Sequence, residues 1–282
     1  MIDSPARRHA VGLALLALGA AGLVAAALLR GANPDAAWAA ALDTRSWLGI
    51  PNAGDVLTNL PFLPAGLMGL LFARRQHAPG PVFASSAERS AWLAFFAFVL
   101  VTGFTSGWFH LAPSADRLCF DRLTLVIACE AVFCAVLAER VSARAGAALL
   151  PLLSLGAAAA TFWWWWTQRQ GAADLRWYAA AQLLPIAALV LVLALTSSRD
   201  AGLGLWWLIV FYGAAKLAEM LDQPILSTNG VVSGHACKHL LAAAAAWSAY
   251  LVLRRRLSPG GATAPVASSD PRARAVPPAP RP

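Results

Sequence analysis

The sequence predicts an all-α protein, a polytopic membrane helical bundle with a seven-helix core and an extra N-terminal span. The chain is 59% hydrophobic and only 13% charged, and its mean hydropathy is +0.60. A soluble domain carries about a quarter charged residues, so this composition is typical of a membrane protein. Apolar runs of about 20 residues, the length that crosses a bilayer, recur from one end of the chain to the other.

Eight apolar runs define the expected spans. They lie near residues 10–30, 54–74, 91–111, 121–138, 146–166, 177–196, 203–222 and 233–253. Arg7 and Arg8 precede the first run and Ala-rich sequence follows it, so a cleaved signal peptide is the alternative to the retained helix that we favour. We expect an N-terminal span and outer loop (1–50), the core (51–256) and a disordered cytoplasmic tail (257–282) rich in Pro, Ala, Ser and Arg.

The arginines near the span ends divide unequally between the two sides of the membrane. One side collects eleven (Arg7, Arg8, Arg74, Arg75, Arg89, Arg140, Arg144, Arg199, Arg254, Arg255, Arg256) and the other six (Arg30, Arg45, Arg117, Arg122, Arg169, Arg176). The richer side is expected to be cytoplasmic, with both termini. Topology and anionic lipid account for the net charge of +8, so we expect no nucleic-acid partner. The Ala, Arg and Trp bias favours a bacterial inner membrane, and the sequence sets no oligomeric state.

Three histidines converge in this topology. His110 lies where the third span leaves the membrane, and His235 and His239 lie where the eighth enters it, so all three share the periplasmic face. Ser106 lies one helical turn before His110, and Asp121 begins the fourth span on the same face. Ionisable groups inside a bilayer are costly and usually functional, and imidazoles from two distant helices are what a buried metal site needs.

This residue set suits metal-assisted hydrolysis. Three neutral imidazoles leave a tetrahedral Zn²⁺ one open position for water. Bound zinc lowers the pKa of that water to about 7 and polarises a carbonyl oxygen. Asp121 could accept the proton of the attacking water, and Ser106 could hydrogen-bond the water or the developing oxyanion. The alternative is that the histidines only hydrogen-bond to backbone groups or lipid headgroups near the interface.

The other charges within the spans favour an interhelical network. We expect Lys216 to pair with Glu130 or Glu219, and Lys238 to pair with Asp222 or Glu219. Direct catalysis or transport by these groups, or a chromophore on Lys238, are the alternatives.

Two polar residues at the outer end of the second span have two possible roles. Asp55 and Asn59 share a helix face there, where they either cap and pack the helix or bind a cation and orient the site. The four cysteines have no CxxC spacing, so we expect buried apolar side chains.

At these residues the sequence resembles the alkaline ceramidase family, part of a superfamily of seven-span membrane hydrolases that includes the adiponectin receptors. The resemblance rests on Ser106-x3-His110, on Asp121 eleven residues after His110, on His235-x3-His239 in the last span, and on Phe109 and Thr58-Asn59 as local context. It covers roughly residues 50–253, so the first span lies outside it. It implies a zinc-dependent amidase acting on ceramide-like lipids. By matched position, His110, His235 and His239 would be zinc ligands, Asp121 the proton acceptor and Ser106 the oxyanion or water contact.

The sequence also departs from the family pattern. Arg122, Leu123 and Thr124 follow Asp121 where the family often has Glu and Pro, and Ala236, Cys237 and Lys238 stand where it often has aromatic residues. The segment 43–55 is shorter and less acidic than the family's calcium-binding segment, so Ca²⁺ binding is doubtful.

We therefore expect a zinc-dependent intramembrane hydrolase of lipid amides, ceramidase-like, with the choice of lipid and of amide or ester left open. The alternative function is a non-hydrolytic zinc-containing membrane lipid receptor or scaffold, in which Asp121 would supply a fourth metal ligand.

Overall fold

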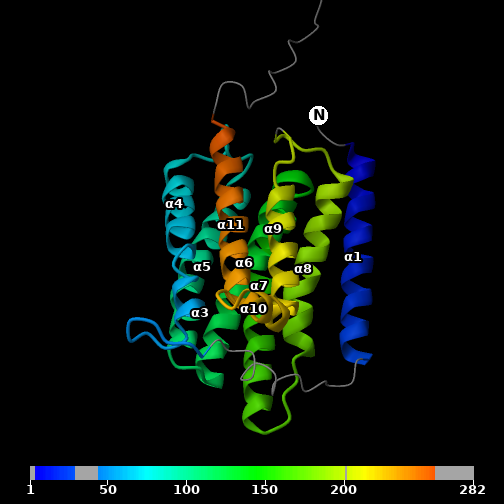
Figure 1. The fold of residues 1–282 in the computed structure, drawn as a ribbon. Coiled ribbons are helices and arrows are strands. Elements are labelled where there is room, and N and C mark those ends of the chain that lie inside the picture. Colours follow the sequence, from blue (N-terminus) through cyan, green and yellow to red (C-terminus); the bar gives the residue numbers. More distant parts are fainter. Residues whose placement is uncertain (1–3, 29–43, 201, 258–282) are drawn as a thin grey trace, which may run out of the picture.

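The computed structural model describes residues 4–28, 44–200 and 202–257, which form a bundle of roughly parallel and antiparallel helices (Figure 1). No strand occurs among these residues, and the predicted all-α fold is confirmed. Arg30, the Ala-rich stretch after the first span, Asp43 and all but the first residue of the predicted tail lie outside the described residues.

The helices follow the predicted order. They are α1 (Pro5–Leu28), α3 (Ala53–Leu57), α4 (Phe62–Arg75), α5 (Ser86–Leu111), α6 (Ala115–Arg140), α7 (Ala143–Arg169), α8 (Arg176–Leu195), α9 (Trp206–Met220), α10 (Asp222–Asn229) and α11 (Gly234–Arg255). Six spans within the described ranges are long and apolar enough to cross a bilayer, with α3 and α4 together counted as one, so the protein is a multi-pass membrane protein. The other two predicted spans are α6, which carries many charges, and α9, which has 15 residues. Both run alongside the rest of the bundle (Figure 1).

Serine side chains start four of these helices. Ser85, Ser114, Ser142 and Ser233 precede α5, α6, α7 and α11, and each hydroxyl accepts a hydrogen bond from a backbone N–H of the first turn. Such a cap satisfies one of the orphaned donors at a helix start, which matters most where little water is present. The caps therefore fix where each helix begins relative to the polar residues beside it.

Helix α6 lies at the centre of the bundle. Every residue from Val126 to Ala138 is buried, and the helix packs against α5, α7 and α8. A helix buried all round belongs to the interior of a large assembly of helices. Six of the seven charged residues of α6 lie outside this buried stretch, and only Glu130 lies within it.

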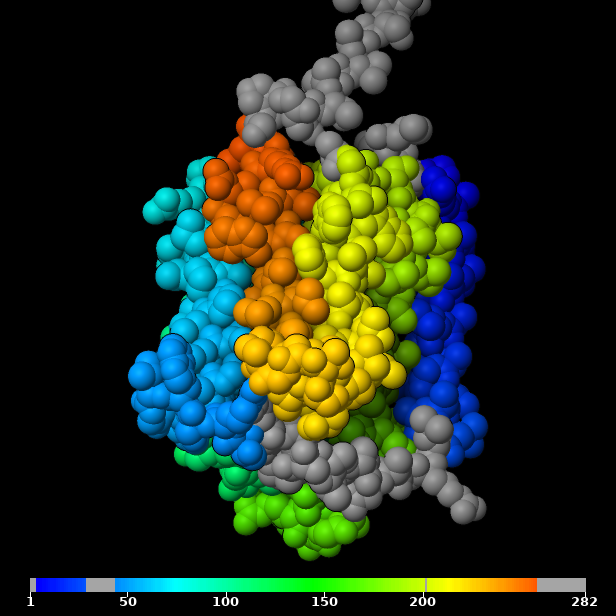
Figure 2. Space-filling view, in the orientation of Figure 1, coloured from blue at the N-terminus to red at the C-terminus, as the bar shows by residue number. Residues whose placement is uncertain are grey.

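The bundle has two ends of different character. At the end that we call the histidine end, α5 finishes, α6 and α11 begin, and the short helix α10 lies across the bundle next to the start of α11 (Figures 1 and 2). Gly230 ends α10 with a φ of +66°, a left-handed conformation that glycine adopts readily. The Arg45 guanidinium donates hydrogen bonds to the carbonyls of Gly230 (2.7 Å) and Val231 (2.9 Å). The segment before α3 is thus tied to the loop that leads into α11.

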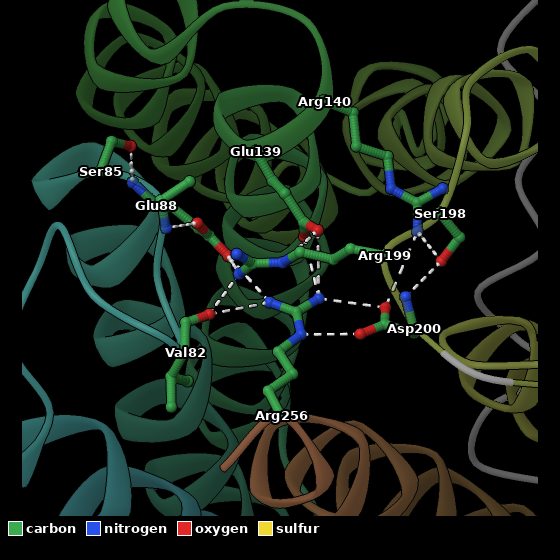
Figure 3. Close-up of polar contacts among 10 residues, drawn as sticks. Val82, Ser85, Glu88, Glu139, Arg140, Ser198, Arg199, Asp200 and Arg256 are labelled. Atoms are coloured by element: carbon green, nitrogen blue, oxygen red, sulfur yellow. Dashed lines mark hydrogen bonds and ion pairs between the residues drawn. The ribbon is translucent and has the colours of Figure 1, made fainter. Parts of the chain in front are cut away.

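The opposite end, the arginine end, holds a buried ion network that the sequence did not predict (Figure 3). Arg256 follows directly after α11, and its side chain is 4% exposed. Its guanidinium donates to Asp200 (2.7 Å), Glu88 (3.0 Å) and Glu139 (3.0 Å). Burial lowers the pKa of Arg256, but the three carboxylates outweigh that effect and raise it above its usual value.

Two further arginines complete the network. Arg199 contacts Glu88 (3.0 Å) and Glu139 (2.9 Å) and donates to the Val82 carbonyl, while Arg140 lies 3.8 Å from Asp200. The three arginines and three acids cancel in charge, as burial requires. The network joins the ends of α6 and α11, the start of α5 and the loop after α8, so it locks the helices at the end opposite the histidines.

Candidate metal centre

The structure brings the three predicted histidines together at the histidine end. His110 lies in the last turn of α5, and His235 and His239 lie in the first turns of α11. Their ring centroids are 5.0, 5.0 and 4.8 Å apart, and one nitrogen from each ring lies within 4.8 Å of the others. Nitrogen ligands about 2.0–2.1 Å from one tetrahedral zinc would be about 3.3 Å apart, which small rotations of the rings can reach.

The surroundings of His110 fit a metal ligand. The residue is 0% exposed, and neither ring nitrogen has a hydrogen-bond partner within the described part of the chain. Its Nδ1 lies 3.7 Å from the buried carboxylate of Asp55, too far for a hydrogen bond. A buried polar group without a partner is costly, and a bound metal ion would supply that partner. A buried group of three histidines could thus hold a metal ion, and imidazole is a good ligand for zinc and several other transition metals.

Residues before and after α3 contact the ring of His239 and the backbone of His110. His239 Nδ1 lies 3.1 Å from Thr58 Oγ1 and 3.3 Å from Asn59 Nδ2, so its Nε2 remains for a metal. Asn52 donates a hydrogen bond to the backbone carbonyl of His110 (2.6 Å). Partners that fix the ring of a metal-binding histidine strongly affect metal affinity.

The structure places Asp55 and Asn59 beside the histidines. The N-cap position of α3 belongs to Asn52, which makes no side-chain cap hydrogen bond. Asp55 is fully buried and accepts a hydrogen bond from Ser233 (3.3 Å), the residue that caps α11. Both predicted residues therefore face the imidazoles and the helix that carries two of them, so they position the site.

Asp121 and Ser106 form a second polar pair beside the histidines. The Ser106 side chain is buried and lies beside the Asp121 carboxylate. Because Ser106 lies one turn before His110 on α5, this contact places Asp121 about one helical turn, roughly 5 Å, from the imidazole level. The three-histidine group contains no carboxylate.

Lysines and acids surround the other side of the site. Glu219 pairs with Lys216 (2.8 Å) and with Lys238 (3.0 Å). For each lysine, Glu219 was one of the two predicted partners. Lys238 Nζ also lies 2.9 Å from His235 Nε2, so a metal bound through that nitrogen would displace the ammonium. Asp222 accepts a hydrogen bond from the backbone N–H of His235 (2.7 Å) and pairs with neither lysine in the described structure. Of the two predicted partners of Lys216, Glu219 rather than Glu130 forms the ion pair in the described structure.

The chain was compared with family models, with curated proteins and with solved structures, and none of these matches it. The candidate metal centre therefore rests on the geometry described above.

Proposed function

We propose that this protein is a zinc-dependent intramembrane hydrolase of lipid amides, similar in chemistry to the alkaline ceramidases. The observation that carries the proposal is a buried set of three imidazoles that each offer one nitrogen within 4.8 Å of the others, with one ring that has no hydrogen-bond partner among the described residues. The order of Ser106, His110, Asp121, His235 and His239 along the chain adds the family resemblance.

The ligand number supports catalysis over a purely structural role. Structural zinc sites usually have four protein ligands, whereas catalytic sites have three and an open position. The group of three contains histidines alone, and Asp121 is not part of it. When bound, zinc would supply a more acidic water molecule and would polarise the carbonyl oxygen of the substrate.

The residues of the chain would move the protons. Asp121 accepts the proton of the attacking water and passes it to the nitrogen of the leaving amine as the C–N bond breaks and a C–O bond forms. The products are a carboxylic acid and an amine. The Ser106 hydroxyl lies beside Asp121, where it can orient the carboxylate or donate to the developing oxyanion.

The bundle suits a lipid substrate. The imidazoles lie at the end of long apolar helices, so an acyl chain can lie among the spans while its amide reaches the histidine end. The arginine counts favour a periplasmic histidine end and cytoplasmic termini, and with the composition a bacterial inner membrane.

Metal analysis and a lipid screen test this function. Purified protein should contain about one zinc per chain; His235→Ala should lose it, whereas His77→Ala, which changes an exposed histidine in a loop, should retain it. Turnover of a long-chain N-acyl amide should vanish in Asp121→Ala with zinc retained, and the exposed Asp116→Ala should remain active. Wild-type protein that binds zinc but cleaves neither lipid amides nor esters would reject the hydrolase and favour the receptor or scaffold.

A further inference from the structure

A long apolar groove lies on the side of the bundle where α1 stands apart from α6 and α7. Its volume is about 970 Å³, and α1, α6, α7 and α8 line it. Leucines of α1 and α7 contribute to its apolar walls, with Arg8 and Ser142 at the arginine end and Trp163 and Trp177 toward the histidine end. Residues 142 to 163 of α7 rise about 32 Å, so the groove runs nearly the full thickness of a bilayer's hydrocarbon core.

One acidic side chain interrupts this apolar surface. Glu130 of α6 lines the groove, is 2% exposed, and has one carboxyl oxygen enclosed without any hydrogen-bond partner in the described structure. Because an isolated carboxylate in hydrocarbon is very costly, the side chain is a neutral acid whose O–H is a hydrogen-bond donor. Glu130 lies ten residues before the end of α6, about 15 Å into the membrane and close to its middle.

The groove is distinct from the metal centre. Glu130 and Asp121 are nine residues apart on α6, which at about 100° per residue places them on opposite faces of the helix. Asp121 contacts Ser106 of α5, whereas Glu130 faces the groove bounded by α1 and α8. The chemistry at the histidine end therefore makes no use of Glu130.

The depth of Glu130 selects among membrane lipids. The ester groups of a phospholipid stay near the interface, about 15 Å from this carboxyl group. A plain acyl chain would leave the acid without a partner, and a cationic lipid would require the costly charged form. A long-chain lipid with an uncharged carbonyl group deep in the bilayer satisfies both the apolar walls and the O–H donor.

We propose that this groove binds an isoprenoid quinone, with a ring carbonyl accepting a hydrogen bond from Glu130 and the isoprenoid chain lying along the leucines of α1 and α7. Trp163 and Trp177, toward the histidine end of the groove, offer aromatic faces on which the isoprenoid chain can pack.

Binding of a decyl-substituted benzoquinone to the full chain in lipid nanodiscs tests the proposal. Glu130→Leu should weaken binding about fivefold, the effect of one net hydrogen bond, while Glu130→Gln, which keeps an N–H donor, should bind within about twofold of wild type. A saturated fatty acid methyl ester, which has an acyl chain but no quinone ring, should not displace the quinone from the groove.

Filling the groove gives an independent arm of the experiment. Gly156 lines the groove, and a Cβ built there meets no atom within 4 Å, so Gly156→Leu extends a side chain from an open position of the groove wall and should abolish binding. Gly213→Leu on α9 is the matched control, because that glycine is equally open but lies outside the groove. Unchanged melting temperatures establish that the variants fold. Equal quinone affinity in wild type, Glu130→Leu and Gly156→Leu would overturn the proposal, as would displacement by the methyl ester.

Discussion

Replacing Arg256 by Met should destabilise the bundle more than any other single change at the arginine end. The guanidinium bonds to three carboxylates and to the Val82 carbonyl (3.1 Å), and its side chain is 4% exposed. A methionine side chain is similar in length to that of arginine but carries no charge. The carboxylates of Glu88, Glu139 and Asp200 would then face two positive charges and not three. Breaking a buried ion pair by removing one partner costs about 3–5 kcal/mol. For a protein of this size that corresponds to a fall in melting temperature of about 10 °C.

The chain carries a reporter for this measurement. Cys119, Cys129 and Cys134 are buried and free, so a thiol-reactive dye labels them only as the helices separate. Thermal unfolding in detergent can then be followed through dye fluorescence for wild type and variant.

Arg255→Met is the matched control, because Arg255 is exposed and directly precedes Arg256. It should change the melting temperature by about 1–2 °C at most, since exposed charges contribute little. Arg256→Lys should fall between the two, as an ammonium keeps the charge but cannot hold three carboxylates in one plane. Equal melting temperatures for Arg256→Met and Arg255→Met would refute the idea that the network stabilises the fold.

Three other predictions concern the histidine end and its loops. A hydrogen bond from Arg176 holds the pKa of Asp174 below its usual value, so Asp174 stabilises the fold above about pH 4 and loses that effect as the pH falls further. The melting temperature of Asp174→Asn should therefore lie below that of wild type at pH 7, and the gap should narrow in acid; a constant gap would contradict this. Asn59→Leu should weaken zinc binding about 10–100-fold in a competition titration, with Asn229→Leu on α10 as a control that leaves it unchanged. Removing zinc with a chelator should lower the melting temperature of wild type but not of His235→Ala, and an equal fall in both would count against a bound ion.

The sequence predicted the convergence of the imidazoles because membrane topology leaves few choices. Once the spans were placed, the exit of the third and the entry of the eighth had to share a face, and His110, His235 and His239 came with them. The i, i+4 spacing of the last two then set their common helix face. Hydropathy and helical periodicity thus supplied most of what positions these rings.

The orienting contacts were harder to predict. Thr58 and Asn52 reach the histidines because the chain turns between α3 and α4 and because Asn52 adopts a φ of +49°. Neither feature follows from an apolar run. The available signal was the clustering of amide and hydroxyl groups at the outer end of the second predicted span.

The arginine network was missed for a different reason. The positive-inside rule treats Arg199 and Arg256 as charges at the membrane surface, which says nothing of burial. Glu88, Glu139 and Asp200 lie near the same span ends, and their number could have indicated pairing. The orientation of Glu130 was also not predictable. No sequence pattern showed that this side chain faces α1 and not the side chain of Lys216, because the rotation of a helix within the bundle depends on side-chain packing.

The placement of the histidines has a consequence for biosynthesis. His110 is inserted with α5, but its two partners follow more than a hundred residues later, at the start of the final helix. During translation the His110 imidazole therefore has no other histidine beside it until α11 enters the bilayer and packs into the bundle. A ribosome-arrested chain that stops before residue 234 should therefore retain no zinc, because two of the three candidate ligands would not yet have been made.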